Sequence, residues 1–225
     1  MSRRAIRHCV LLLALAGVGA PRVSAEEFLY LENTDSGDVS VISIPEHEVV
    51  STIAVGKYLD DVAASSDGRT IYVNRVESAG HPLSKRLGES GEVIAISTES
   101  EEIVWRAPTR GWPHHMTLSA DDELLFVPLY DRPYLEVFNT KSHEAVGLVP
   151  APFGSHGTRL SADGRRLYVG SMLMDMLLVY DLAERRPVKR IALDDAVRPF
   201  AFTADEKTAY VQLSRLHGFE VVDLE

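Results

Sequence analysis

Apolar and polar residues alternate in short stretches from Phe28 to the end of the chain. Alternation over four to eight residues is typical of β-strands with one face buried. Some neighbouring stretches are separated by an Asp-Gly dipeptide, as at Asp67-Gly68 and Asp163-Gly164. Asp-Gly between two alternating runs predicts a tight hairpin, because glycine accepts the positive φ that such turns require. The sequence lacks convincing helical periodicity with capping residues, so we expect an all-β fold.

The strand pattern repeats at a fixed interval. Four aligned segments are SSDGRTIYV ending at Val73, SADDELLFV ending at Val127, SADGRRLYV ending at Val169 and TADEKTAYV ending at Val211. Two further series keep the same register: the aromatics Tyr30, Tyr72, Phe126, Tyr168 and Tyr210, and the apolar residues Val41, Ala95, Val137, Val179 and Val221. The spacing is 42 residues except for one spacing of 54 in each series, so a 12-residue insertion falls between Val73 and Val93. Three series with one shared interruption define the repeat unit.

Each unit contains four short strands, and four-stranded sheets that repeat at about 40 residues are the signature of β-propeller blades. We therefore predict that residues 26–225 form one β-propeller repeat domain of four-stranded antiparallel blades. The count gives three strands of a first blade, three whole blades and three strands of a fifth blade that ends at Leu224. Four to five blades make an incomplete ring with unpaired strand edges. We expect a C-terminally truncated fragment of a longer protein, and closure by oligomerisation is the alternative.

The repeat also carries a family pattern. The motif Gly/Pro-x-His-x-x-x-Ser-x-Asp-Gly-x-x-Leu-Tyr-Val, followed by Val-x-Val-Tyr-Asp-Leu, resembles the YVTN β-propeller repeats over residues 27–225. These repeats occur in surface-layer-like and lactonase-type secreted propellers. The resemblance implies a seven-bladed ring in which the C-terminus supplies the innermost strand missing from the first blade. It specifies the fold and leaves the function open, because members of the family differ widely in what they do.

Residues 1–25 have the layout of a secretory signal peptide. A basic start is followed by an apolar run of 11 residues at 10–20 and by the small-residue motif Val23-Ser24-Ala25. The run is shorter than the roughly 20 apolar residues that a membrane-spanning helix needs. We therefore predict a periplasmic or extracellular protein with no membrane insertion after the signal is cleaved.

Removal of this segment changes what the composition implies. Cys9 is the only cysteine, so the predicted mature chain has no disulfide, thiol nucleophile or cysteine-based metal or haem attachment. The segment carries four arginines and no acidic residue, which leaves 19 basic against 33 acidic side chains and a net charge of −14. Such an acidic chain repels phosphate backbones, so nucleic acid is excluded as a partner.

The register predicts which side chains gather at one rim of the central channel. Four residues stand seven positions before the turn aspartates: Asp60, His114, His156 and Arg198. Trp112 and His115 lie beside them, and the loops between second and third strands add Asp175 and His217, which are 42 residues apart. We predict that these eight residues form a ligand-binding rim.

Four interpretations of the rim remain open. A metal site would use His114 and His156 with Asp175 or His217, since imidazole and carboxylate suit zinc, copper or iron, and its cofactor would be a divalent metal. A lactonase-like hydrolase would use His114 or His156 as a base and Arg198 to stabilise an oxyanion. The favoured interpretation is a non-enzymatic rim that recognises a protein, an envelope glycan or a small ligand, assisted by the long loop at 75–91. In the fourth interpretation these residues only hold neighbouring blades together.

Overall fold

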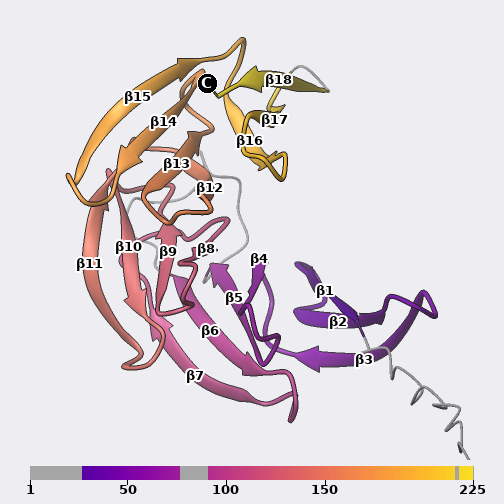
Figure 1. The fold of residues 1–225 in the computed structure, drawn as a ribbon. Helices are drawn as coiled ribbons and strands as arrows, with labels where there is room; N and C mark the ends of the chain where they lie inside the picture. Colours follow the sequence, from indigo (N-terminus) through magenta and orange to yellow (C-terminus); the bar gives the residue numbers. More distant parts are fainter. Residues whose placement is uncertain (1–26, 77–90, 216–217, 225) are drawn as a thin grey trace, which may run out of the picture.

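The computed structural model describes residues 27–76, 91–215 and 218–224, which form five antiparallel sheets and contain no helix (Figure 1). Over these residues, no helix is long and apolar enough to cross a membrane. The predicted signal peptide at 1–25 lies outside the described residues, as do His217 and most of the loop at 75–91.

The sheets follow one another along the chain as blades one to five. Blade one consists of β1 (Phe28–Asn33), β2 (Asp38–Ser43) and β3 (Glu48–Ala54). Blade two consists of β4 (Leu59–Ala64), β5 (Thr70–Val76), β6 (Gly91–Ser97) and β7 (Ile103–Pro108). Blade three consists of β8 (Thr117–Leu118), β9 (Leu124–Pro128), β10 (Tyr134–Asn139) and β11 (Glu144–Pro150). Blade four consists of β12 (Ser155–Leu160), β13 (Arg166–Ser171), β14 (Met176–Asp181) and β15 (Arg186–Ala192). Blade five consists of β16 (Val197–Phe202), β17 (Thr208–Leu213) and β18 (Phe219–Asp223).

The blades stand around a common axis as in a β-propeller, which confirms the predicted fold class. The first strands β4, β8, β12 and β16 lie innermost, and the last strands β7, β11 and β15 lie at the periphery (Figure 1). Blades one and five have three strands each, as the repeat count predicts. The five blades form an arc that is open between blade one and blade five, so the incomplete ring is confirmed for the described residues (Figure 1).

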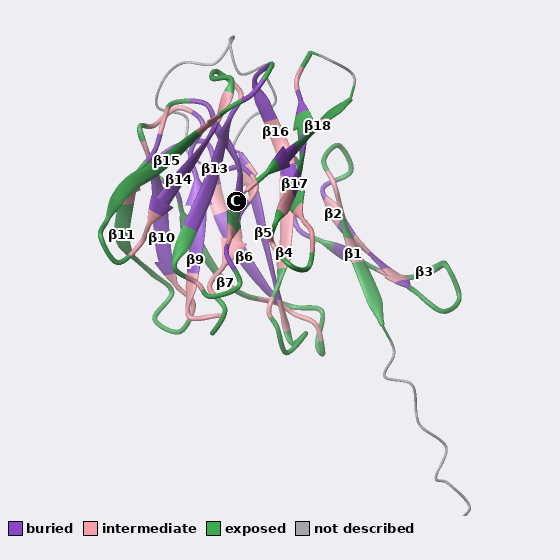
Figure 2. Cartoon of the chain, turned by 45° about the horizontal axis from the view of Figure 1, so that its top comes forward, coloured by how far each residue is buried: buried purple, intermediate pink, exposed green. Residues whose placement is uncertain are grey.

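The hydrophobic core lies between successive blades. Four apolar clusters each join one blade to the next, whereas the outermost strands are largely exposed (Figure 2). The repeating aromatic of the second strand faces the following blade: Tyr72, Phe126 and Tyr168 are 5%, 3% and 7% exposed. Each aromatic pairs across the sheet with the third-strand apolar residue of the second repeat series, as Tyr72 does with Ala95. The two series are therefore cross-strand neighbours, which explains their common spacing.

The turn between first and second strands has the same construction in blades two to five. In each, a Ser or Thr hydroxyl donates to the turn aspartate, whose Oδ1 also accepts from the backbone N–H two residues later. The residue directly after the turn aspartate has positive φ in all four blades. It is glycine in blades two and four, as predicted for Gly68 and Gly164, but Asp122 and Glu206 occupy this position in blades three and five. Asp122 accepts hydrogen bonds from the backbone and hydroxyl of Ser66 in the preceding blade, at 2.8 and 2.6 Å. This inter-blade contact offsets backbone strain that a glycine would avoid.

Candidate functional site

Equivalent positions of successive blades meet at the inner ends of the first strands. Asp60 lies in β4, His156 in β12 and Arg198 in β16, while His114 lies three residues before the start of β8. Neighbouring blades pack through these strands, so residues 42 or 54 positions apart in sequence become adjacent in space. The structure thereby brings Asp60, His114 and His156 together with His115.

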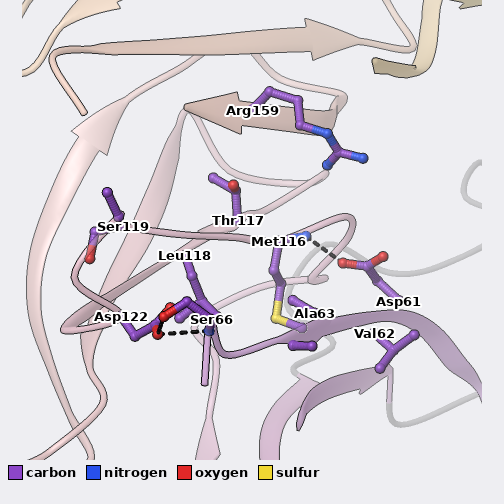
Figure 3. A pocket seen from close by; sticks show the side chains of 12 residues that line it. Asp61, Val62, Ala63, Ser66, Met116, Thr117, Leu118, Ser119, Asp122 and Arg159 are labelled. Atoms are coloured by element: carbon purple, nitrogen blue, oxygen red, sulfur yellow. Dashed lines mark hydrogen bonds between the residues drawn. The ribbon is translucent and has the colours of Figure 1, made fainter. Parts of the chain in front are cut away.

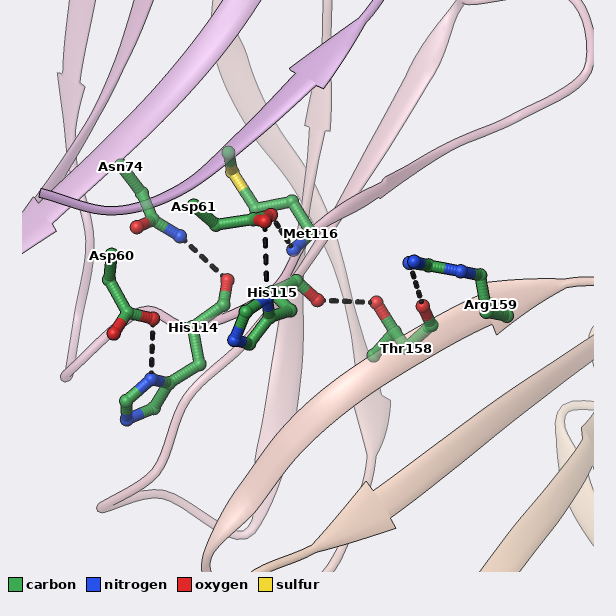
Figure 4. A network of polar contacts seen from close by, with 8 residues as sticks. All are labelled: Asp60, Asp61, Asn74, His114, His115, Met116, Thr158 and Arg159. Atoms are coloured by element: carbon green, nitrogen blue, oxygen red, sulfur yellow. Dashed lines mark hydrogen bonds and ion pairs between the residues drawn. The ribbon is translucent and has the colours of Figure 1, made fainter. Parts of the chain in front are cut away.

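Asp60 and His114 form a close pair across the junction of blades two and three. The Asp60 Oδ2 and His114 Nδ1 atoms are 2.6 Å apart, and Asn74 Nδ2 donates to the His114 carbonyl at 2.6 Å (Figure 4). Burial acts to raise the pKa of Asp60, but the charge and hydrogen bond of His114 outweigh it and lower the pKa to about 2. In the neutral form of His114, a carboxylate at Nδ1 fixes the tautomer with its proton on that atom, which leaves a lone pair on Nε2. The His114 Nε2 atom is buried and has no hydrogen-bond partner among the described residues.

A second Asp–His pair lies beside the first, one residue further along each of the two segments. His115 Nδ1 is 3.1 Å from Asp61 Oδ1, and the Met116 backbone N–H donates to Asp61 Oδ2 at 2.7 Å (Figure 4). Thr158 of blade four donates to the His115 carbonyl at 2.7 Å, so this segment is held from both sides. Burial acts to lower the pKa of His115, but the hydrogen bond and charge of Asp61 prevail, so the pKa is raised. His115 therefore keeps its proton to a higher pH than an isolated imidazole does.

His156 lies against both of these imidazoles. Its ring centroid is 4.5 Å from that of His114, with 30° between the planes, and 4.6 Å from that of His115, with 43°. Burial lowers the pKa of His156 to about 2, and the positive charges of the neighbouring histidines and Arg198 act in the same direction. The ring is therefore neutral. Its buried Nδ1 has no hydrogen-bond partner within the described part of the chain.

The other predicted rim residues are placed differently. Trp112 is 9% exposed and packs with Val76 and Tyr130, with its ring centroid 5.5 Å from that of His114. Arg198 is half-buried, and its charge acts on His156. Asp175 lies in the exposed turn between β13 and β14, where no contact joins it to the histidines among the described residues. His217 is outside the described residues.

Some residues at the site were missed by sequence reasoning. Asp61 is not among the predicted rim residues, although it stands 54 positions before His115, the same offset that relates Asp60 to His114. Glu32 of β1 approaches from blade one: burial raises its pKa, and the charges of Asp61 and Asp60 add to that effect. Arg159 of β12 occupies a position that does not recur in the repeat. The Asp61–His115 pair, by contrast, has a signal in the sequence, because the 54-residue offset between blades two and three relates the two residues.

A groove leads from the Asp61–His115 pair along the inner strands. It has a volume of about 420 Å³ and is lined by β4, β8 and their turns, with Arg159 at one border (Figure 3). Asp61, Met116 and Thr117 lie near the histidine end, and Ser66 and Asp122 lie at the opposite end. A volume of 300–1,000 Å³ is typical of small-molecule sites.

The histidine cluster has the chemistry of an acceptor or base. Asp60 orients His114 as a carboxylate does in general-base catalysis or behind a metal-ligating histidine. No group of three or more His, Cys, Asp or Glu side chains is arranged to hold a metal ion among the residues that the structure describes. His114 and His156 would be the imidazole ligands of any such ion, and their unpartnered nitrogens suit that role or acceptance of hydrogen bonds from a ligand.

Comparisons with known proteins agree with the fold. No protein-family model matches the chain, and no curated protein matches it. Hydrazine synthase from Kuenenia stuttgartiensis is similar in structure, with a TM-score of 0.71, 17% identity and coverage of 88% of this chain and 60% of that chain. Dihydro-heme d1 dehydrogenase NirN in complex with DHE is also similar, with a TM-score of 0.60, 19% identity and coverage of 88% and 41%. This chain thus spans 60% and 41% of the lengths of these two proteins, and at such identities the likeness establishes a β-propeller and nothing finer.

Proposed function

We propose that the chain is an exported recognition propeller that binds a small ligand at the inner rim of blades two to four. The observation that carries the proposal is the pair of buried imidazole nitrogens, His114 Nε2 and His156 Nδ1, that have no partner among the described residues. Leaving a buried polar atom unpaired costs about 1–3 kcal/mol. A ligand that donates hydrogen bonds to these nitrogens would remove that cost.

Two features support binding here rather than a purely structural role. The apolar clusters between blades already hold the sheets together, and His114 and His156 are not part of them. The groove lined by Asp61 and Met116, the hydrogen-bond partners at the second Asp–His pair, gives a ligand body of moderate size a place next to the cluster. The NirN structure, which is in complex with DHE, is a precedent for ligand binding by a chain with this fold. Export is proposed from the signal-like layout of residues 1–25.

The test compares three asparagine variants of the mature chain. A panel of N-acetylglucosamine, chitobiose, free amino acids and lactones is screened by thermal unfolding, in which a ligand at 100 times its Kd stabilises the protein by about 2.7 kcal/mol. We expect at least one compound to raise the Tm of the natural protein, and His114→Asn and His156→Asn to abolish the rise. The control is His143→Asn, because His143 lies exposed on the outer part of blade three, stacked on Trp105. A compound that stabilises all variants equally would bind elsewhere, and a panel without any effect would refute small-ligand recognition of these classes.

A secreted lactonase-like hydrolase or metal-dependent enzyme is the second candidate. The 2.6 Å contact between Asp60 and His114 favours it, because a carboxylate-oriented imidazole with a free Nε2 is competent to take a proton from water. Arg198 would stabilise developing negative charge beside His156. Turnover of lactones or esters, with metal analysis of chelator-free protein, distinguishes the candidates. Turnover that survives the combined His114→Ala and His156→Ala substitutions would show that these residues are not the base.

A further inference from the structure

The outer strand of each of blades one to four carries one residue directly opposite the third-strand apolar residue that defines the repeat. These four residues are Ser51, Trp105, Gly147 and Lys189. In three blades this side chain crosses to the following blade: the Ser51 hydroxyl donates to Glu101, the Trp105 ring stacks on His143 and the Lys189 ammonium donates to the Leu224 carbonyl. Gly147 has no side chain, so blade three lacks this contact.

Blade two shows how an aromatic ring fills this position. The Trp105 ring lies between Tyr72 of its own blade and His143 of blade three, with its centroid 6.0 Å from that of Tyr72 and 5.0 Å from that of His143. The planes of Trp105 and His143 are 18° apart, so these two rings are stacked. Trp105 also packs against the apolar cluster that joins blades two and three, and it therefore fills the outer part of that junction.

The junction between blades three and four has a hollow at the corresponding place. Its volume is about 340 Å³, which is within the range of small-molecule sites. Gly147 lines it together with Phe126 and Arg185, which occupy the repeat positions of Tyr72 and His143. The rest of the wall is mostly apolar and includes Val137, Val149, Tyr180 and Leu182. A Cβ atom added to Gly147 would meet only the Val137 Cβ among the described residues, at 4.0 Å, so the space in front of this glycine is open.

Arg185 is placed to cover a ring in this hollow. It is exposed and has positive φ in the turn between β14 and β15, as His143 does in the equivalent turn of blade three. The neighbouring Arg186 forms an ion pair with Glu184 at 2.5 Å, whereas the Arg185 guanidinium makes no hydrogen bond or ion pair within the described part of the chain. A planar guanidinium stacks on aromatic faces, so Arg185 can take the place that the His143 ring has in the preceding junction.

We propose that this hollow binds a small planar aromatic molecule of about the size of indole, in the place that Trp105 fills in blade two. Phe126 forms the inner wall, and Arg185 stacks on the ring from blade four. Val146 and Leu148 of β11, which are 54% and 47% exposed, extend the apolar border of the site (Figure 2). The site lies on an outer strand, whereas the histidine cluster lies on the inner strands, so the inference goes beyond the proposed recognition at the inner rim (Figure 1).

The experiment measures binding of indole, phenol and cyclohexanol to the purified protein by isothermal titration calorimetry. We expect indole and phenol to bind, and cyclohexanol, which matches phenol in size but is not planar, to bind roughly threefold more weakly or not at all. Gly147→Trp should weaken indole binding by roughly tenfold or more, because the new side chain fills the same space. It should also raise the Tm without ligand, because it buries apolar surface and removes a glycine from a strand. Lys189→Trp, the same substitution at the equivalent position of blade four, is the matched control and should bind indole as the natural protein does.

Arg185→Ala tests the site without adding bulk to the hollow. It should weaken indole binding by roughly threefold, because the stacking guanidinium is lost. Equal indole affinity in the natural protein and Gly147→Trp overturns the inference, as does the absence of binding by both aromatic compounds. Binding of N-acetyltryptophanamide without binding of free indole overturns the assignment to a small molecule and identifies the side chain of a partner peptide instead. Failure of the recognition proposal appears separately, as insensitivity of compound binding to the His114 and His156 substitutions.

Discussion

Acidification should destabilise this propeller through His156. The side chain is 5% exposed and lies against two other imidazoles, and its pKa is lowered from 6.5 to about 2. In the unfolded chain the same imidazole titrates near 6.5. Between these two values the unfolded state binds a proton that the folded state does not. The free energy of unfolding therefore falls as the pH drops below 6.5.

The size of the effect follows from the shift. Each pH unit below 6.5 costs about 1.4 kcal/mol, so at pH 4.5 the loss from His156 reaches about 2.7 kcal/mol. Among the neighbouring groups, His115, whose pKa is raised, contributes its full stabilisation below pH 6.5, and Asp60, with a pKa lowered from 3.8 to about 2, loses its contribution only at more acidic pH. Glu32, whose pKa is raised, binds a proton in the folded state before the unfolded state does, and this opposes the loss as the pH falls. The contribution of His156 is therefore isolated by the difference in slope between the natural protein and a His156 variant.

Urea denaturation of the mature protein at half-unit pH steps measures this slope. The natural protein should lose stability at about 1.4 kcal/mol per pH unit more steeply than His156→Asn, whatever the absolute stability of the variant. His143→Asn should retain the slope of the natural protein. Parallel curves for the natural protein and His156→Asn would refute the conclusion that burial among like charges holds this ring neutral.

Two further predictions concern the packing around the site. Phe126→Ala should lower the free energy of unfolding, measured by urea denaturation, by about 3–5 kcal/mol, because this side chain is 3% exposed. Tyr210→Ala, at the equivalent position of blade five, should lower it by about 1 kcal/mol or less, because Tyr210 is 44% exposed. Similar losses for the two variants would contradict the assignment of the core to the space between blades. Asn74→Ala removes the donor to the buried His114 carbonyl and should cost about 1–3 kcal/mol, while an unchanged stability would mean that another donor replaces the amide.

Much of the fold can be predicted from the sequence because residues at repeated positions make the same contacts in successive blades. Positions such as Tyr72 and Ala95 pair across a sheet, and each faces the next blade, so selection of apolar side chains recurs at the repeat length. The hairpin turns were also predictable, since Asp67 and Asp163 each accept a hydrogen bond from the backbone N–H of the residue two positions later. At Asp122 the αL turn position is occupied without glycine, supported by a contact from another blade that no local pattern reveals.

The site was only partly predictable for a related reason. The register placed Asp60, His114 and His156 at equivalent positions, but it did not reveal that Asp60 and His114 would be in direct contact while Asp175 stays apart in an exposed turn. Pairing depends on how two blades are rotated relative to each other, and that angle is set by packing between sheets rather than by sequence spacing. Arg159 depends on the same geometry, since only the arrangement of β8 and β12 brings its guanidinium over Thr117.

The inner-rim position has a consequence for engineering. Asp60, His114, His156 and Arg198 occupy one repeat position in four blades, and this position is not used by the apolar clusters that bind the blades together. Each can be exchanged without removing an apolar side chain from these clusters. The identity of the residue at this repeat position in each blade sets the charge and proton affinity of the inner rim. Moving the carboxylate from β4 to β12, for example, would change which imidazole nitrogen it orients and would leave the apolar clusters between the blades in place.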